Sequence, residues 1–298
     1  MPGQYKKAPL VYVTARIRTT PIPNLSPDQV TLIQQVMVKN GLVIPVTSQG
    51  KSVNINPLAT MNPADLGTTP AINFQNITRY GFLAFDRTQC LVIDADGIEW
   101  RASQYTKYEN FVQSFTKILD ALIETVDVFG FIHTQELVLS YADLITPMMG
   151  RSLGDYFKNA DAILPLSFLK DKKQDVRQMG QIQVVRIIKP TQKITISLEQ
   201  LPVLDKKVHK YLPAEMIEPD NALSMPILLR EESKYIEATS YGLLMTQAGL
   251  LENFPLKTFN IDNEFKALHK LTSDTFKSLL NEEICNQDWE YTDNIGAH

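Results

Sequence analysis

The sequence has few residues of the kinds that build metal sites and disulfide frameworks. Only two cysteines and four histidines occur among its 298 residues. Cys90 and Cys285 lie far apart in the chain, and no CxxC or HxxxH spacing surrounds them. A disulfide framework and a closed zinc site are therefore both unexpected. We expect the two cysteines to be buried free thiols, and we expect the protein to use no metal and no cofactor.

Long apolar stretches are also missing. No window reaches the roughly 18 consecutive apolar residues of a membrane span. Residues 1–20 carry Lys6, Lys7, Arg16 and Arg18 among short apolar runs, and they lack the apolar core of about 7 to 15 residues that marks a secretory signal. We therefore predict a cytoplasmic protein with no membrane partner.

Neither sign of charge dominates the chain. Lys and Arg number 29 against 33 Asp and Glu, which gives a net charge of −4 at pH 7. Such a balance supplies no overall field for a phosphate backbone, so nucleic acid is not the expected partner. With 44% hydrophobic residues, 13 Gly and 17 Pro, the composition is that of a globular protein and excludes disordered and collagen-like classes.

Local motifs for nucleotide binding and for nucleophilic hydrolysis are absent. The sequence contains no GxGxxG, no GxxxxGK[ST] and no GxSxG. Because catalytic groups can assemble from distant positions, an enzyme with a dispersed active site remains an alternative. Asp94 and Asp96 resemble the start of a calcium loop, but Ile98 and Trp100 stand where further oxygen ligands would be needed. We expect a plain turn there.

The first half of the chain predicts strands and two helices. Pro9–Thr20 alternates, with Val11, Val13, Ala15 and Ile17 on one face of a strand and Tyr12, Thr14, Arg16 and Arg18 on the other. Ser26, Pro27 and Gly41 bound a helix over 27–40. Residues 42–76 are rich in Pro, Asn, Thr and Gly, and we expect an irregular loop there with no more than one short strand.

A second, longer helix is predicted over 106–126. Thr106 and Glu109 have the spacing of a capping box. An apolar stripe follows, formed by Phe111, Phe115, Ile118, Leu119, Leu122 and Val126. Before this helix, strand-like runs over 80–86, 90–94 and 98–103 predict an antiparallel meander, with a turn at 95–97.

The order of strands and helices predicted for the first half then repeats in the second half. We expect strands over 136–145, 181–188, 193–201 and 226–247, a short helix over 152–160, and a last helix over 262–284. The predicted fold is α+β, with two pseudo-equivalent strand-helix-strands-helix units (1–130 and 131–298) that form one curved antiparallel sheet with the long helices packed on one side. Two unrelated α+β domains are the alternative.

Several segments resemble one family. They are YKKAPLV at 5–11, YTKYENF at 105–111, LVLSYAD at 137–143, and Leu268-His269 followed by Phe276 and Trp289. In these positions the chain resembles a sporadically distributed, functionally uncharacterised prokaryotic family of similar length. The resemblance implies the architecture and carries no catalytic residues. The family's patchy distribution implies an accessory role such as immunity, antitoxin or phage defence.

Two groups of residues are candidate binding sites. Arg151 and Ser152, at the start of the helix predicted over 152–160, could hold an anion. Trp100, Tyr105 and Tyr108 form an aromatic cluster that could stack a ligand, although packing at the helix entry is the stronger expectation. His133, His209 and His269 are expected to be structural or exposed.

These observations favour a non-catalytic protein that recognises another protein through a sheet face or through the segment 42–76. The partner could be encoded by a neighbouring gene, and a homo-oligomer is also compatible with the sequence. A sensor of a small molecule or nucleotide is the first alternative, and the dispersed enzyme is the second.

Overall fold

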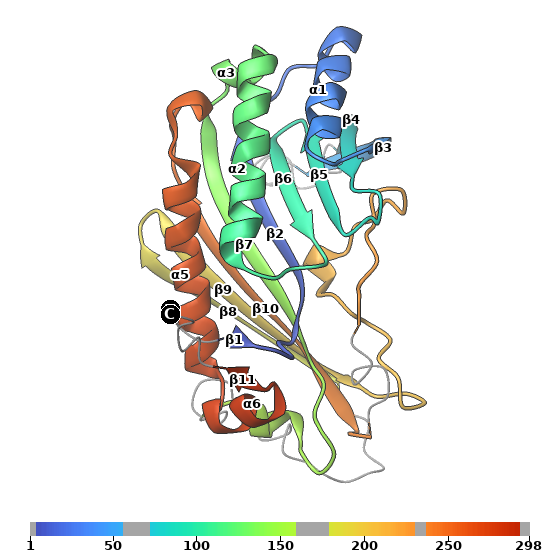
Figure 1. Ribbon diagram of the computed structural model, residues 1–298, viewed down its shortest axis with the longest axis vertical. Helices are drawn as coiled ribbons and strands as arrows, with labels where there is room; N and C mark the ends of the chain where they lie inside the picture. Colours follow the sequence, from blue (N-terminus) through green and yellow to red (C-terminus); the bar gives the residue numbers. More distant parts are fainter. Residues whose placement is uncertain (1–3, 56–71, 159–178, 230–236, 293–298) are drawn as a thin grey trace, which may run out of the picture.

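The structure is a computed structural model, and it describes residues 4–55, 72–158, 179–229 and 237–292. One antiparallel sheet of nine strands dominates these residues (Figure 1). In order across the sheet, the strands are β3 (Ile44–Ile55), β4 (Ile72–Leu83), β5 (Gln89–Asp94), β6 (Gly97–Ala102), β2 (Leu10–Thr19), β7 (Thr134–Ile145), β10 (Ser240–Leu251), β9 (Gln192–Pro202) and β8 (Gly180–Lys189). The α+β class expected from the sequence is confirmed.

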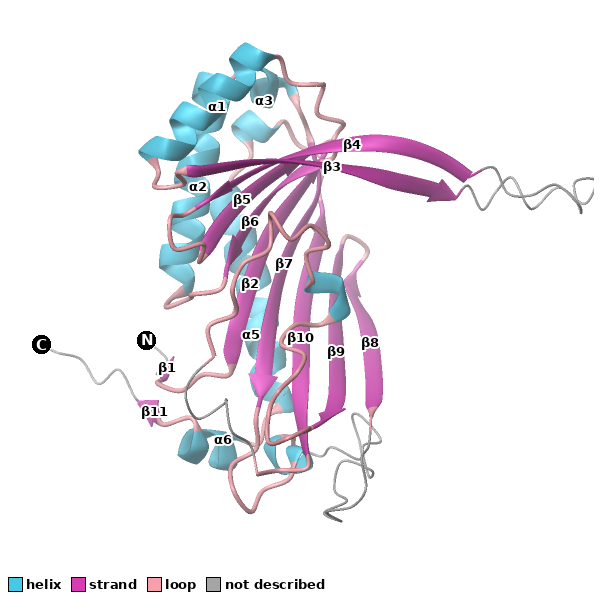
Figure 2. Ribbon diagram, turned by 90° about the vertical axis from the view of Figure 1, so that its right-hand side faces the viewer, coloured by secondary structure: helices cyan, strands magenta, loops and turns pink. Residues whose placement is uncertain are grey.

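The long helices lie on one face of this sheet, as Figure 2 shows. They are α1 (Pro27–Lys39), α2 (Tyr108–Thr125) and α5 (Ile261–Leu279). The shorter elements are α3 (Val128–Phe131), α6 (Glu282–Asp288), the 3₁₀ helices η3 (Leu153–Tyr156), η5 (Ala214–Met216) and η7 (Leu256–Thr258), and the strand pair β1 (Gln4–Tyr5) with β11 (Tyr291–Thr292). No helix in the described part of the chain is long and apolar enough to cross a membrane.

Strand β2 follows the predicted alternation with one exception. Val13, Ala15 and Ile17 are buried in the core beneath the helices. A bulge between Leu10 and Tyr12 shifts the register, and Val11 packs against a separate apolar cluster. The prediction that Val11 shares a face with Val13 was therefore wrong, because the extra residue of the bulge moves the side chain before it to the other face of the strand.

Helix α1 forms as predicted. The Ser26 hydroxyl accepts a hydrogen bond from the Gln29 amide at 3.2 Å, and the Gln29 side chain accepts one from the Ser26 amide at 2.9 Å. Gly41 has a φ of +85°, a conformation that glycine adopts without steric cost. Both ends of the helix are thus determined by local sequence.

Helix α2 confirms its apolar stripe but not its capping box. All six stripe residues are buried. The helix begins at Tyr108, and the side chain of its N-cap residue Lys107 makes no capping hydrogen bond. Thr106 instead accepts a 3.4 Å hydrogen bond from the Asn110 side chain. The predicted cap was wrong because burial of the stripe, rather than local capping, sets where this helix starts.

The expected irregular loop at 42–76 was also wrong. Residues 44–55 and 72–76 belong to β3 and β4, which pair in register from Ile44 opposite Leu83 to Ile55 opposite Ile72. The two strands form an arm that projects from the sheet (Figure 2). Strands that project away from the core bury neither face in it, so their sequence need not alternate between apolar and polar residues. Hydrophobic periodicity therefore does not predict these two strands. Residues 56–71 lie outside the described residues.

Three predictions in the second half need correction, whereas β7, β8 and β9 lie where they were expected. The strand expected over 226–247 starts only at Ser240, and residues 230–236 lie outside the described residues. The helix expected over 262–284 is two helices, α5 and α6, because Leu280 leaves the helix to bridge with Phe157. The helix expected over 152–160 is the four-residue η3, with the predicted capping pair of Ser152 and Asp155 in place; residues 159–160 are not described.

The sheet face opposite the helices is crossed by residues 215–225, which belong to the connection between β9 and β10. Leu223 from this segment is buried among Leu83, Cys90 and Val92. It lies so close to Gly81 in β4 that a Cβ there would come within 2.1 Å of it. The segment is therefore anchored on strands from the other half of the chain.

Candidate binding site on the open face of the sheet

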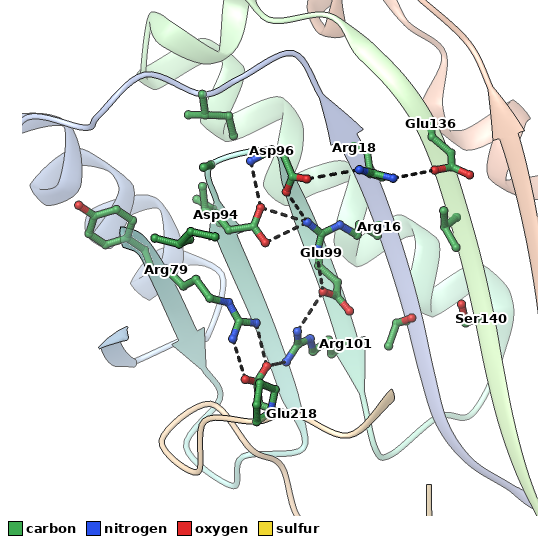
Figure 3. Close-up of a pocket in the computed structure, with 18 of the residues that line it drawn as sticks. Arg16, Arg18, Arg79, Asp94, Asp96, Glu99, Arg101, Glu136, Ser140 and Glu218 are labelled. Carbon is green, nitrogen blue, oxygen red and sulfur yellow. Dashed lines mark hydrogen bonds and ion pairs between the residues drawn. The ribbon is translucent and has the colours of Figure 1, made fainter. Parts of the chain in front are cut away.

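The open face of the sheet contains a hollow of about 1280 Å³ (Figure 3). Strands β2, β5, β6 and β7 form its floor. Residues 77–80 of β4 form one wall, and residues 21–25 and 215–219 complete the rim. The hollow thus lies between the arm, the central strands and the crossing segment.

The floor is polar because of the alternation along β2. Thr14, Arg16 and Arg18 project from the face opposite the core and line the hollow. Glu99 and Arg101 do the same from β6, where Ile98 and Trp100 face the core. Strict alternation on two neighbouring strands therefore places charged side chains side by side.

Ten charged side chains that line the hollow form one continuous network of ion pairs. Cations and anions alternate along it in the order Lys193, Glu136, Arg18, Asp96, Arg16, Glu99, Arg101, Glu218 and Arg79, with Asp94 as a branch on Arg16. The network crosses the sheet from β9 to β4 and contains five cations and five anions. Its members neutralise one another.

One end of the network is tight and buried. Glu218 accepts hydrogen bonds from Arg79 at 2.6 and 2.8 Å and from Arg101 at 2.6 Å. Burial favours the neutral acid, but these hydrogen bonds outweigh it and lower the pKa of Glu218 to about 2. The Glu99 side chain is only 13% exposed, which favours the neutral acid, yet Arg101 at 2.9 Å keeps the pKa of Glu99 below its usual value. Glu218 thereby ties the crossing segment to both the arm and the floor.

The centre of the network is one arginine surrounded by three carboxylates. Arg16 contacts Asp94 at 2.9 Å, Asp96 at 2.7 Å and Glu99 at 3.2 Å. Burial raises the pKa of Asp94 despite the Arg16 guanidinium, and the neighbouring Asp96 adds to the rise. The turn expected at 95–97 is present, and the carboxylates of Asp94 and Asp96 beside it hold the Arg16 guanidinium.

The other end of the network is loose and open. Arg18 lies 3.4 Å from Glu136 and 3.5 Å from Asp96, and its side chain is 50% exposed. Lys193 lies 3.0 Å from Glu136 and is 46% exposed. Strand β10 lies between β7 and β9, and a Cβ at its Gly249 would lie 3.2 Å from Glu136 and 3.1 Å from Lys193. Because glycine has no side chain, Glu136 of β7 and Lys193 of β9 can form their ion pair across β10.

The predicted aromatic cluster lies on the helix side of the sheet, away from the hollow. Trp100 is 1% exposed, and its ring lies 6.3 Å from that of Phe111. Tyr105 contacts the same Phe111 ring at 5.9 Å. Tyr108 stacks on His269 at 4.0 Å. The three residues therefore pack around the entry of α2, and a ligand-stacking role for them stays a prediction.

The predicted anion site lies near α6. Arg151 contacts Asp288 at 2.7 Å and donates a hydrogen bond to Gln287 at 2.8 Å. The Ser152 hydroxyl donates to Asp155 at 2.9 Å. Both side chains thus have protein partners, and anion binding by them stays a prediction.

The histidines have local contacts in the structure. His133 pairs with Asn253 at 3.2 Å, and His209 contacts the Leu204 carbonyl at 3.0 Å. His269 lies 2.9 Å from the Tyr141 hydroxyl, and burial lowers its pKa. Among the described residues, the histidines do not line the hollow.

Sequence reasoning missed most of the network. The alternation over 98–103 could have placed Glu99 and Arg101 on the open face, just as it placed Arg16 and Arg18. Glu218 follows a run without periodicity, so no local signal connects it with Arg101, which is 117 residues away. Long-range ion pairs of this kind follow from the fold alone.

The network presents charged hydrogen-bond donors and acceptors to the hollow. In the described part of the chain, no three His, Cys, Asp or Glu residues are grouped so that they could hold a metal ion. Comparison of the sequence with models of protein families, with curated proteins and with solved structures found no match.

Proposed function

We propose that this chain is a non-catalytic cytoplasmic binding protein, and that the hollow on its open face receives a polar segment of another protein. The observation that carries the proposal is the ten-residue network lining a hollow of about 1280 Å³. Charged side chains are rarely buried in a protein core unless they are paired with a group of opposite charge. Here the chain instead keeps paired charges at the floor of an accessible hollow.

The dimensions and charge of the hollow favour a protein segment as its occupant. Sites for small molecules usually measure about 300 to 1000 Å³ and are mostly apolar, whereas this hollow is larger and its floor is charged. Because five cations face five anions, a polyanion gains little, which disfavours nucleic acid. A polypeptide segment with side chains of both signs matches the alternation.

The sequence resemblance supports an accessory role for this binding, of the immunity, antitoxin or phage-defence kind, with a partner encoded by a neighbouring gene. The strand order supports two pseudo-equivalent units, 1–130 and 131–298. Strands β2 and β7 pair at the centre of the sheet, and each half continues to an outer strand, β3 or β8, before returning inward. In each half, the longest helix, α2 or α5, follows the last strand that this half contributes to the nine-stranded sheet.

Site-specific photo-cross-linking in the native host tests the proposal. A photoreactive amino acid at Asn24 or at Glu215, both exposed on the rim, should cross-link to one partner protein that mass spectrometry identifies. The same probe at Gln35, exposed on α1, is the matched control and should give no such product. Equal cross-linking from Gln35, or no protein product from either rim position, would contradict the proposal.

An enzyme with a dispersed active site is the second candidate. The observation that favours it is the convergence of Asp94 and Asp96, whose pKa values are shifted in opposite directions, as in acid–base pairs. Rim probes would then yield no protein product, and small molecules would copurify with the chain. Loss of turnover in a stable Asp94→Asn variant would identify this role.

A further inference from the structure

A row of uncharged polar side chains lies beside the charged network on the open face of the sheet. Thr14 of β2 is directly opposite Ser140 of β7, and Ser140 is directly opposite Gln247 of β10. Tyr12 precedes Thr14 by two residues and therefore shares its face of β2. All four side chains line the hollow, and Ser140 lies next to the network in Figure 3. The floor of the hollow thus has a neutral part as well as a charged part.

The hydroxyl groups of this row have unused hydrogen-bonding capacity. Tyr12, Thr14 and Ser140 are only 4%, 8% and 2% exposed. Among the described residues, the hydroxyls of Tyr12 and Thr14 have no hydrogen-bond partner. The Ser140 hydroxyl accepts a hydrogen bond from the Gln247 amide nitrogen at 3.0 Å, and the described residues supply no acceptor for its own proton. Because buried polar groups normally have partners, we expect an occupant of the hollow to supply them.

The free donors and the free acceptor of the row match a carboxamide group. A carboxamide oxygen accepts hydrogen bonds from hydroxyls, and its NH₂ group donates them. Burial raises the pKa of Tyr12, so its hydroxyl keeps its proton and can donate. The Gln247 side-chain oxygen has no donor among the described residues and can accept from the NH₂ group.

The surroundings of the row favour a neutral group over a carboxylate. Arg101 of β6 is directly opposite Thr14, but its guanidinium already contacts the carboxylates of Glu99 and Glu218. An entering carboxylate would therefore lose hydration without gaining an unpaired cation. A carboxamide loses less on leaving water, and the row can replace its hydrogen bonds.

We propose that this row is a subsite for the carboxamide of an asparagine or glutamine side chain in the bound protein segment. The subsite consists of Tyr12, Thr14, Ser140 and Gln247. The inference rests on the proposed function and specifies what the segment must carry. The end of a side chain, rather than a peptide group of the main chain, reaches hydroxyls that are as deeply buried as those of Thr14 and Ser140.

Nuclear magnetic resonance titrations of the full-length protein with capped tripeptides test this subsite. The probes are acetyl-Gly-X-Gly-methylamides in which X is Gln, Met, Glu or Gly. The Gln probe should shift backbone signals of β2 and β7 saturably. The Met probe has a side chain of similar length without the amide, and it should bind about tenfold more weakly, which corresponds to the loss of one or two hydrogen bonds. The Glu and Gly probes should also bind more weakly than the Gln probe.

Substitutions that remove single hydroxyls locate the binding. Thr14→Val and Tyr12→Phe should each weaken binding of the Gln probe by about the same factor of ten. Because neither hydroxyl has a partner among the described residues, both variants should keep the wild-type melting temperature. Thr78→Val, exposed on the β4 wall of the same hollow, is the matched control and should bind as the wild type does.

Four results would overturn the inference. They are equal binding of the Gln and Met probes, equal or tighter binding of the Glu probe, equal binding of the Gly probe, which would assign the effect to the main chain, and unchanged binding in both hydroxyl variants. The inference and the proposed function can fail separately. A silent titration with specific rim cross-links removes the subsite alone, and a positive titration without any cross-linked protein removes the protein partner alone.

Discussion

Charged side chains that leave water lose hydration free energy, and the tight end of the network contains several that have done so. Arg101 is 8% exposed and Glu218 is 5% exposed. Arg101 contacts the carboxylates of Glu99 and Glu218, and Glu218 contacts the guanidinium groups of Arg79 and Arg101, so each charge is compensated. At the loose end, by contrast, water still reaches Arg18 and Lys193, so their contacts contribute little to folding.

Substitutions at the two ends should therefore differ in their effect on stability. Glu218→Gln leaves Arg79 and Arg101 without their shared carboxylate, and breaking a buried pair typically costs about 3 to 5 kcal/mol. Arg18→Gln should change the free energy of unfolding by less than about 1 kcal/mol. Urea denaturation at pH 7 measures both values. Equal losses for the two variants would show that the network is uniform after all.

A second buried carboxylate should make stability depend on pH. Asp143 on β7 is 5% exposed, and among the described residues it has no ion-pair partner. Burial raises its pKa from 3.8 to about 8. Between these values the folded state holds a proton that the unfolded state has released, so stability falls as pH rises from about 4 to about 8 and then levels off.

Asp143→Asn should remove this dependence. Relative to the wild type, the variant should gain stability between pH 5 and pH 8, on the order of 2 kcal/mol or more, since one pKa unit corresponds to about 1.4 kcal/mol. Urea midpoints at the two pH values give the comparison. Parallel midpoints for wild type and variant would mean that Asp143 is ionised in the folded protein.

At the scale of elements, substitutions in and before α2 distinguish the contribution of buried side chains to stability from that of local capping. Phe115 is fully buried and contacts Phe265 of α5 with ring centroids 5.9 Å apart. Phe115→Ala should cost about 3 to 5 kcal/mol. Thr106→Ala should cost less than about 0.5 kcal/mol, because Thr106 does not cap the helix. A cost near 1 kcal/mol for Thr106→Ala would indicate that the capping box forms in solution.

Elements with a local signal could be predicted, and those that depend on distant contacts could not. The ends of α1 follow from Ser26 and Gly41, and the faces of β2 follow from its alternation. The β3–β4 arm has no apolar period, and the break at Leu280 depends on Phe157, which lies 123 positions earlier. For the candidate site, sequence placed Arg16 and Arg18 on the correct face, but their partners become neighbours only when the sheet is assembled.

For the whole molecule, the outer edge of β8 is an unpaired edge of the sheet. Among the described residues, β8 pairs with β9 alone. Val185 and Ile187 on this strand are 58% and 77% exposed. Unpaired edges with exposed apolar residues promote association between molecules.

Ile187→Lys should therefore reduce self-association without loss of stability. Val38→Lys on α1, where the valine is 55% exposed, adds the same charge away from any strand edge and is the control. Light scattering over a concentration series should show less association for Ile187→Lys alone. An equal reduction in both variants would attribute the effect to net charge.

The central claim is that the open face, and not the helix face, binds the partner. The most direct measurement is the dissociation constant of the cross-linked partner for rim and helix variants of equal melting temperature. Asn24→Arg and Ile217→Arg, at exposed rim positions, should weaken binding at least tenfold by obstructing the hollow. Gln35→Arg on α1 should leave the constant unchanged. Wild-type affinity in both rim variants, with weaker binding in Gln35→Arg, would contradict the account.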